Sequence, residues 1–142
     1  MTIIVRKVLS ASVIVSGKEV ALINKGLLLY VGISVDDTTK KCEYYAKKIA
    51  HLRIFESEGK DVSVQDVAGE ILSVSQFTLS AETKKGNRPT YSNAMSSQEA
   101  KPLFDYFNKC LHTESNLIIQ TGIFGADMTI PAVDDGPFTI IL

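Results

Sequence analysis

A polar run in the middle of the sequence holds the residue types best suited to chemistry. Residues 73–79 carry three hydroxyl side chains and one amide within an otherwise apolar, strand-like stretch. A threonine hydroxyl attacks a carbonyl only when a neighbouring base takes its proton, and no such base is evident beside Thr78. We therefore interpret Thr78 as a hydrogen-bonding residue, with a nucleophilic role as the alternative. Strand alternation predicts that Gln76 and Thr78 share one face and Ser75 and Phe77 the other.

A glycine–proline pair near the C-terminus is the second candidate. Gly136-Pro137 lies between two apolar runs, residues 129–133 and 138–142. Glycine tolerates backbone angles that other residues avoid, and a bond before proline can be cis at modest cost. Such a pair can point two backbone carbonyls in one direction and so recognise a ligand without a side chain. The alternative is a plain turn that joins two strands.

The chain lacks the residues of the commoner hydrolytic sites. Its two histidines, His51 and His112, fall at the C-terminal ends of predicted helices, where a histidine usually complements the helix dipole. No metal-ligand spacing, phosphate-binding loop or nucleophile elbow is found. A hydrolase built from this sequence would work without a triad or a metal, and we expect no cofactor.

Composition limits the possible partners. The net charge is −1, so any contact with nucleic acid must come from a local patch of cations. The best candidate is the segment that contains Lys84, Lys85 and Arg88, for which a solvated loop is the alternative. Cys42 and Cys110 lack metal or redox spacing and are predicted to be buried thiols. Without a membrane span or signal peptide, the chain is expected to be cytoplasmic.

The predicted elements give an α+β fold in a single domain, residues 1–142. Two helices are expected, the first over residues 38–52 and the second from a capping box at Ser96 and Glu99 to about His112. They would cover part of a largely antiparallel sheet. Apolar runs and alternation predict its strands at residues 3–8, 12–15, 19–23, 27–35, 53–55, 70–79, 117–120, 124–133 and 138–142.

Several of these motifs, in order along the chain, resemble the D-aminoacyl-tRNA deacylase family. The resemblance rests on the Ser-Gln-Phe-Thr sequence at residues 75–78 and on the C-terminal Gly136-Pro137. It extends over the whole chain, through residues 8–13 and 52–55. The resemblance implies a barrel-like sheet in a homodimer whose active sites lie near the interface. It also implies an enzyme whose substrate is an amino acid esterified to the 3′-terminal adenosine of tRNA.

The same resemblance implies roles for particular residues. Backbone donors around residues 75–77 would hold the ester, and the vicinal ribose hydroxyl or a nearby water would replace a protein base. The carbonyls of a cis Gly136-Pro137 unit would bind the α-ammonium group and exclude an L side chain. Glycyl-tRNA would fit as well, because the α-carbon of glycine is achiral. The remaining implied site residues are Phe124, Ala126, Met128 and Lys7 for substrate, and Lys84, Lys85 and Arg88 for tRNA.

The sequence departs from the family pattern at three positions. Asp134 replaces the usual asparagine, Phe138 a valine and Lys7 an arginine. The first and last of these changes lead us to expect a less rigidly braced loop. Two other functions remain as alternatives. One is a relaxed paralogue that corrects L-alanyl-tRNA, and the other is a nucleic-acid-binding dimer without enzymatic activity.

Overall fold

The computed structural model describes residues 1–84 and 86–142. Its elements follow in the order β1 (Thr2–Val15), β2 (Lys18–Ile23), β3 (Gly26–Gly32), α1 (Thr39–Ala50), β4 (Phe55–Ser57), β5 (Lys60–Val62), β6 (Glu70–Ser75), the 3₁₀ turn η1 (Phe77–Ser80), α2 (Ser97–Ser115), β7 (Ile119–Thr121) and β8 (Ala132–Ile141). No helix within these ranges is long and apolar enough to span a membrane.

The main sheet has the order β2-β1-β3-β6-β7, and outside this path β8 also pairs with β1. Strand β1 is antiparallel to β2, β3 and β8, whereas β6 is parallel to both β3 and β7. The long β1 therefore lies at the centre of a nearly closed, barrel-like mixed sheet. The predicted α+β class and barrel-like sheet are confirmed. The two parallel strand pairs, β3–β6 and β6–β7, were not predicted from the sequence.

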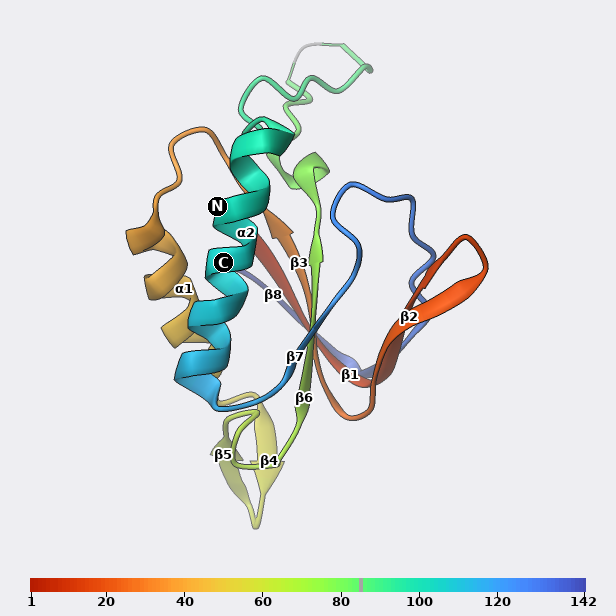
Figure 1. Cartoon of the computed structure of the whole chain (residues 1–142). Coiled ribbons are helices and arrows are strands. Elements are labelled where there is room, and N and C mark those ends of the chain that lie inside the picture. Colours follow the sequence, from red (N-terminus) through yellow and green to blue (C-terminus); the bar gives the residue numbers. More distant parts are fainter. Residues whose placement is uncertain (85) are drawn as a thin grey trace.

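Both helices cover the same face of the sheet (Figure 1). Each belongs to a connection between neighbouring parallel strands: α1 lies between β3 and β6, and α2 between β6 and β7. Parallel neighbours need a long crossover, which is almost always right-handed. Two right-handed crossovers that continue in one direction across a sheet place both helices on the same side. The β4–β5 hairpin projects beyond the sheet below them.

Two apolar clusters hold these layers together. One lies between the sheet and the helices and includes Leu27, Leu29 and Val31 of β3. The other lies on the opposite face of the sheet and includes Leu28. The nearly continuous apolar sequence of β3 predicts burial on both faces, and the structure confirms it. Buried Cys42 belongs to the first cluster, and burial raises the pKa of its thiol to about 12.

The helix ends agree with the sequence to within a few residues. Thr38 is the N-cap of α1 and Ser96 that of α2. Helix α2 continues to Ser115 rather than ending at His112, and it stops where Asn116 adopts a left-handed conformation with φ of 54°. The Ser96 hydroxyl contacts the Glu99 carboxylate at 2.6 Å instead of a backbone N–H, so the reciprocal capping box is incomplete.

Candidate active site

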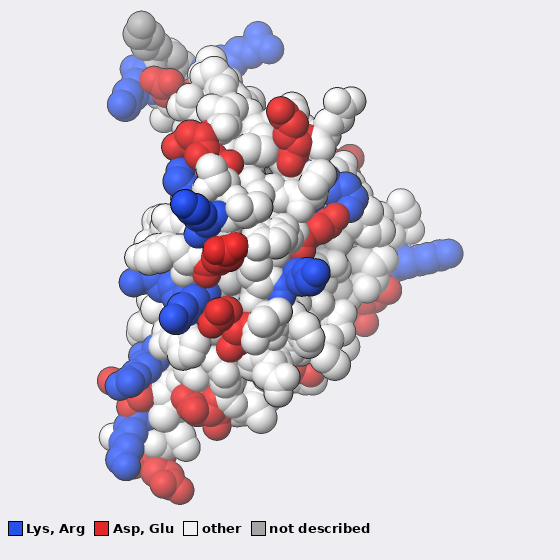
Figure 2. Space-filling view, turned by 60° about the vertical axis from the view of Figure 1, so that its left-hand side comes forward, with Lys and Arg blue, Asp and Glu red and all other residues white. Residues whose placement is uncertain are grey.

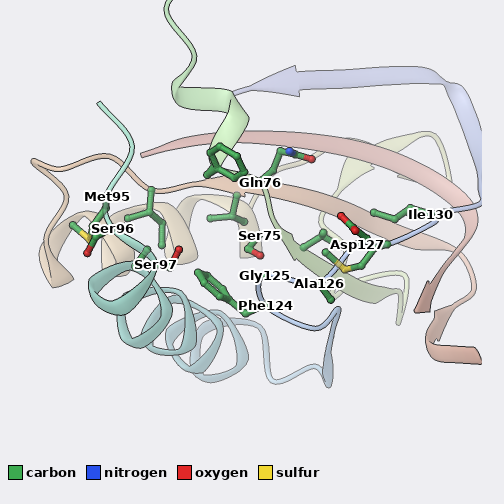
Figure 3. A pocket seen from close by; sticks show the side chains of 16 residues that line it. Ser75, Gln76, Met95, Ser96, Ser97, Phe124, Gly125, Ala126, Asp127 and Ile130 are labelled. Carbon is green, nitrogen blue, oxygen red and sulfur yellow. The ribbon is translucent and has the colours of Figure 1, made fainter. Parts of the chain in front are cut away.

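A pocket of about 560 Å³ opens between the end of β6, the start of α2 and the loop that joins β7 to β8 (Figure 3). Its volume lies within the range of small-molecule sites. Predicted site residues Ser75, Gln76 and Phe77 line it. So do Phe124, Ala126 and Met128, which the sequence places almost fifty residues away. Sequence analysis missed the other lining residues, which are Val31, Ile33, Val74, Met95, Ser96, Ser97, Ala100, Gly125, Asp127 and Ile130.

The polar run does not continue as a strand to residue 79, as predicted. Strand β6 ends at Ser75, and the chain turns through η1. The partner strand β3 ends at Gly32, where an added Cβ would lie 2.8 Å from Cβ of Leu79 and 3.0 Å from the Gln76 carbonyl oxygen. The turn can pack this closely because Gly32 has no side chain. Tertiary packing thus ends the strand, although its β-type sequence continues.

This turn separates Thr78 from the rest of the motif. Thr78 lines an adjacent shallow hollow of about 450 Å³, which shares Gln76, Met128 and Ile130 with the main pocket. The Gln76 side-chain amide donates a hydrogen bond to Oγ1 of Thr78. An amide cannot accept a proton as a general base does. The predicted alternation of residues 75–78 on two strand faces is wrong, because these residues do not form one strand.

Backbone donors at the turn fall into two groups. The Gln76 N–H donates to the Val31 carbonyl at 2.8 Å and is therefore occupied. The N–H groups of Phe77 and Thr78 meet no acceptor among the described residues, as expected for the first turn of a helix. The turn therefore offers two free donors beside the pocket and its adjoining hollow.

The loop before β8 forms the opposite wall. Residues 124–131 lie outside any regular strand, so the strand predicted at residues 124–133 is wrong over most of its length. A turn places Gly125 at φ of 77°. Residues along this loop alternate between partly buried and exposed, which explains the strand-like pattern. Phe124 packs on Phe104 of α2 at 5.8 Å between ring centroids, whereas Met128 packs against the second apolar cluster.

The start of α2 supplies the third wall. Met95 donates its N–H to the Ile33 carbonyl at 3.0 Å, and this contact aligns the chain before the helix with the end of β3. The N-cap Ser96 and the first helical residue, Ser97, consequently border the pocket. The capping signal in the sequence located this helix start, but it gave no indication that the start faces a pocket.

Charge is sparse inside the pocket. Asp127 is the one ionisable side chain among the lining residues. Within residues 1–84 and 86–142, no cluster of three or more His, Cys, Asp or Glu side chains is arranged to hold a metal ion. His51 and His112 lie at the helix ends as predicted, where each Nδ1 contacts a backbone carbonyl at 2.8 and 2.7 Å respectively.

Gly136 and Pro137 lie inside β8 and not in a turn between two strands. Arg6 pairs with Thr139 and Val8 with Asp134, so residues 135–138 bulge out of the ladder opposite one residue of β1. The Gly136–Pro137 bond is cis, as predicted. Both residues are exposed and line neither hollow. The structure therefore does not bring the two carbonyls to the pocket of their own chain.

The bulge is held by two ion pairs that the sequence did not suggest. Arg6 contacts Asp134 through Nε at 3.1 Å and Nη2 at 2.8 Å, and this pairing raises the pKa of Arg6. Lys7 lies 3.2 Å from the Asp135 carboxylate and lines neither hollow. We expected Asp134 to lose a bracing contact. Instead, the planar guanidinium group of Arg6 braces it through two hydrogen bonds, which the ammonium group of Lys7 could not arrange in the same way.

Two of the three predicted tRNA-binding residues, Lys84 and Arg88, lie on an exposed hairpin next to η1. Glu82 and Thr90 exchange two backbone hydrogen bonds at its base, and Lys84 and Arg88 are exposed between them. Lys85 lies outside the described residues. Figure 2 shows Lys and Arg interspersed with Asp and Glu on the face that α1 occupies, without an extended basic surface. This face therefore offers tRNA no extended basic surface.

Fold and site together define an α+β protein whose pocket combines apolar side chains with hydroxyls, one amide and one carboxylate, and whose central motif, residues 75–78, contains no catalytic base. Residues 4–142 match the model of the D-Tyr-tRNA(Tyr) deacylase family. The chain belongs to this family, so the resemblance expected from the sequence is confirmed.

Relatives of known description agree with this assignment. The D-aminoacyl-tRNA deacylase of Dichelobacter nodosus (strain VCS1703A) is 48% identical over 141 residues, covering 98% of this chain and 97% of the relative. That of Flavobacterium psychrophilum (strain ATCC 49511 / DSM 21280 / CIP 103535 / JIP02/86) is 47% identical over 144 residues, covering 100% and 96%.

Two solved structures have the same fold. The c-Myc DNA Unwinding Element Binding Protein is 41% identical with a TM-score of 0.92, covering 100% of this chain and 97% of that protein. A probable eukaryotic D-amino acid tRNA deacylase has a TM-score of 0.85 at 17% identity, covering 100% and 99%. The second likeness establishes the fold alone.

Proposed function

We propose that this protein hydrolyses the ester bond of D-aminoacyl-tRNA and releases the free D-amino acid and tRNA. The observation that carries the proposal is the convergence of Ser75, Gln76 and Phe77 with Phe124 and other residues of the loop in one pocket. Membership of the deacylase family supplies the substrate class. Aminoacyl-tRNA is the substrate of protein synthesis, so the protein acts in the cytoplasm.

The chemistry uses the substrate's own hydroxyl in place of a protein base. Water attacks the ester carbonyl while the vicinal ribose hydroxyl positions it and takes part in its proton transfer. The carbonyl oxygen becomes an oxyanion, which the free N–H groups of Phe77 and Thr78 can stabilise. Collapse breaks the bond to the ribose oxygen, which leaves with a proton. This route agrees with the environment of Thr78, whose hydroxyl accepts a hydrogen bond from the Gln76 amide, which is not a base.

Stereoselection is assigned to the backbone carbonyls of Gly136 and Pro137. They would accept the α-ammonium group and leave no space for an L side chain, whereas a D residue or glycine fits, including glycine mischarged on tRNA-Ala. Because these residues line neither hollow of their own chain, the filter requires a second copy. A homodimer is therefore part of the proposal.

The edge strand β8 supports such a dimer. Its outer edge has no strand partner among the described residues. Val133, Phe138 and Ile141 are 54, 42 and 71% exposed on it. A two-fold interface through β8 would bury these side chains and bring the same strands together from both copies. Sedimentation showing a monomer at micromolar concentration would overturn the dimer and the filter with it.

The deciding experiment compares single-turnover hydrolysis of D-tyrosyl-tRNA, L-tyrosyl-tRNA and L-alanyl-tRNA. We expect rapid release from the D substrate alone. A 2′-deoxy terminal adenosine should slow that release strongly. Preferential hydrolysis of L-alanyl-tRNA would instead indicate the relaxed paralogue.

The second candidate is a nucleic-acid-binding dimer. It is favoured by the relative at 41% identity whose name describes binding to a DNA unwinding element. Binding of single-stranded nucleic acid without any ester hydrolysis would support it. The intact motif at residues 75–78 and the pocket that it borders favour the deacylase.

A further inference from the structure

Two exposed aromatic rings meet at the edge of the pocket. Phe77 is 57% exposed and Tyr91 is 40% exposed. Their ring centroids lie 5.1 Å apart with an interplanar angle of 67°, an edge-to-face arrangement. Phe77 also lines the pocket. The pair therefore extends an aromatic surface from the pocket outward into solvent.

The positions of both rings are fixed by backbone structure. Phe77 is the first residue of η1, and Tyr91 directly follows the Glu82–Thr90 pairing at the base of the exposed hairpin. The chain then runs beside the segment that follows β3, where the Val35 N–H donates to the Asn93 carbonyl at 3.1 Å. The pair is consequently held between two anchored segments.

Two cationic side chains lie on the hairpin that precedes Tyr91. Lys84 and Arg88 project from the same hairpin and are exposed, and neither forms an ion pair with a described residue. Exposed aromatic rings on which bases stack, next to cations that contact the phosphates, are the usual construction of a single-stranded nucleic-acid site. Isolated exposed apolar residues are common on protein surfaces, but two exposed rings in contact with each other, one of which lines a pocket, are not explained by that tendency.

We propose that Phe77 and Tyr91 form a stacking platform for the unpaired nucleotides that precede the terminal adenosine of tRNA. The inference rests on the proposed function, which places the terminal aminoacyl-adenosine in the pocket. The preceding nucleotides then leave across the pocket edge. Base stacking accepts any base because every base has a π-face, so the platform adds affinity for the single-stranded end without reading its sequence.

Tyr91→Ala is the test variant, because Tyr91 does not line the pocket. Its activity is measured on D-tyrosyl-tRNA and on D-tyrosyl-adenosine, which lacks the preceding nucleotides. We expect kcat/KM to fall about tenfold or more on the tRNA, the scale of one lost base–aromatic stack, and to stay unchanged on the nucleoside ester. Tyr91→Phe keeps the ring and should restore the tRNA activity.

The chain offers a matched control in Tyr44 on α1. It is 59% exposed and forms a similar edge-to-face pair with Tyr45 at 5.2 Å, but it does not line the pocket. Tyr44→Ala should leave both activities unchanged. An abasic penultimate nucleotide in the tRNA should reduce wild-type activity and have little further effect on Tyr91→Ala, because both changes remove the same stack.

The outcomes separate this proposal from the proposed function. Equal losses on both substrates, or no loss on the tRNA, would overturn the platform while the deacylase activity stands. If the wild type hydrolyses neither ester, the deacylase assignment fails, and fluorescence anisotropy with uncharged tRNA still tests the platform through the same variants. Unchanged anisotropy for Tyr91→Ala would then overturn it. Dissociation of a dimer by Tyr91→Ala would also overturn it, by identifying the pair as a subunit contact.

Discussion

Arg6 and Asp134 form a two-point ion pair between β1 and the start of the β8 bulge, with contacts of 3.1 and 2.8 Å. The two side chains are 24 and 36% exposed. The charge of Asp134 thus lets this chain hold its bulge with an ion pair. The pair connects the bulge of β8 to the central strand of the sheet.

A double-mutant cycle with Arg6→Ala and Asp134→Ala should give a coupling free energy of about 0.5–1 kcal/mol, since partly exposed ion pairs are screened by water. The measurement is urea unfolding of the wild type, both single variants and the double variant. The coupling should shrink in 1 M NaCl. A coupling near zero at low salt would show that the pair does not brace the bulge.

Gly136→Ala should destabilise the protein by about 1–3 kcal/mol, because φ of 133° lies in a region that is nearly exclusive to glycine. An added Cβ would also lie 2.8 Å from the Phe138 nitrogen. Gly59→Ala is the control, since Gly59 has φ of 72° but open space around its Cβ position. Thermal unfolding should show the larger loss for Gly136→Ala, together with reduced deacylation. Equal losses would contradict the argument from crowding.

Thr78→Ala should retain deacylation within about tenfold of the wild type, because it removes one hydrogen bond and no nucleophile. The Gln76 amide that contacts the Thr78 hydroxyl cannot activate it for attack. Single-turnover kinetics measure the loss, and mass spectrometry of quenched reactions searches for an acyl-enzyme. An acyl group trapped on Thr78, or a loss above about a thousandfold, would restore the nucleophile interpretation.

Phe124→Ala and Met128→Ala should slow release from D-tyrosyl-tRNA but leave L-tyrosyl-tRNA a poor substrate. Both residues line the pocket, whereas the proposed chirality filter consists of backbone carbonyls. Ile123→Ala is the control, because Ile123 is 47% exposed and does not line the pocket. The measurement is the single-turnover rate of each variant on D-tyrosyl-tRNA and on L-tyrosyl-tRNA. Rapid L hydrolysis by Phe124→Ala would mean that side chains select chirality.

Cys42 should resist thiol reagents in the folded protein at pH 8. It is fully buried, and burial raises the pKa of its thiol to about 12 from the ordinary value of 9.0. Its neutral form therefore favours folding below pH 9, and this contribution is lost as the pH rises toward 12. Thiol counting with and without denaturant should find Cys42 reactive only after unfolding, whereas Cys110 is partly exposed. Rapid labelling of Cys42 in the native state would contradict this burial.

The sequence by itself determined the family, the two helices and most of the strands. Local signals suffice there, because the apolar residues of α1 recur at helical spacing and β3 is apolar enough for burial on both faces. The same signals fail at Gln76, where the strand ends because the turn packs over Gly32. They also fail in the loop around Phe124, whose alternating burial imitates a strand.

Only the tertiary structure decided which motifs meet. It joins Ser75 and Phe77 with Phe124 and the start of α2, and it leaves Gly136 outside that pocket. It also pairs Arg6 with Asp134 across more than a hundred residues. Such contacts depend on strand register and on the direction of the crossovers, which bring distant segments together in ways that no local residue pattern encodes.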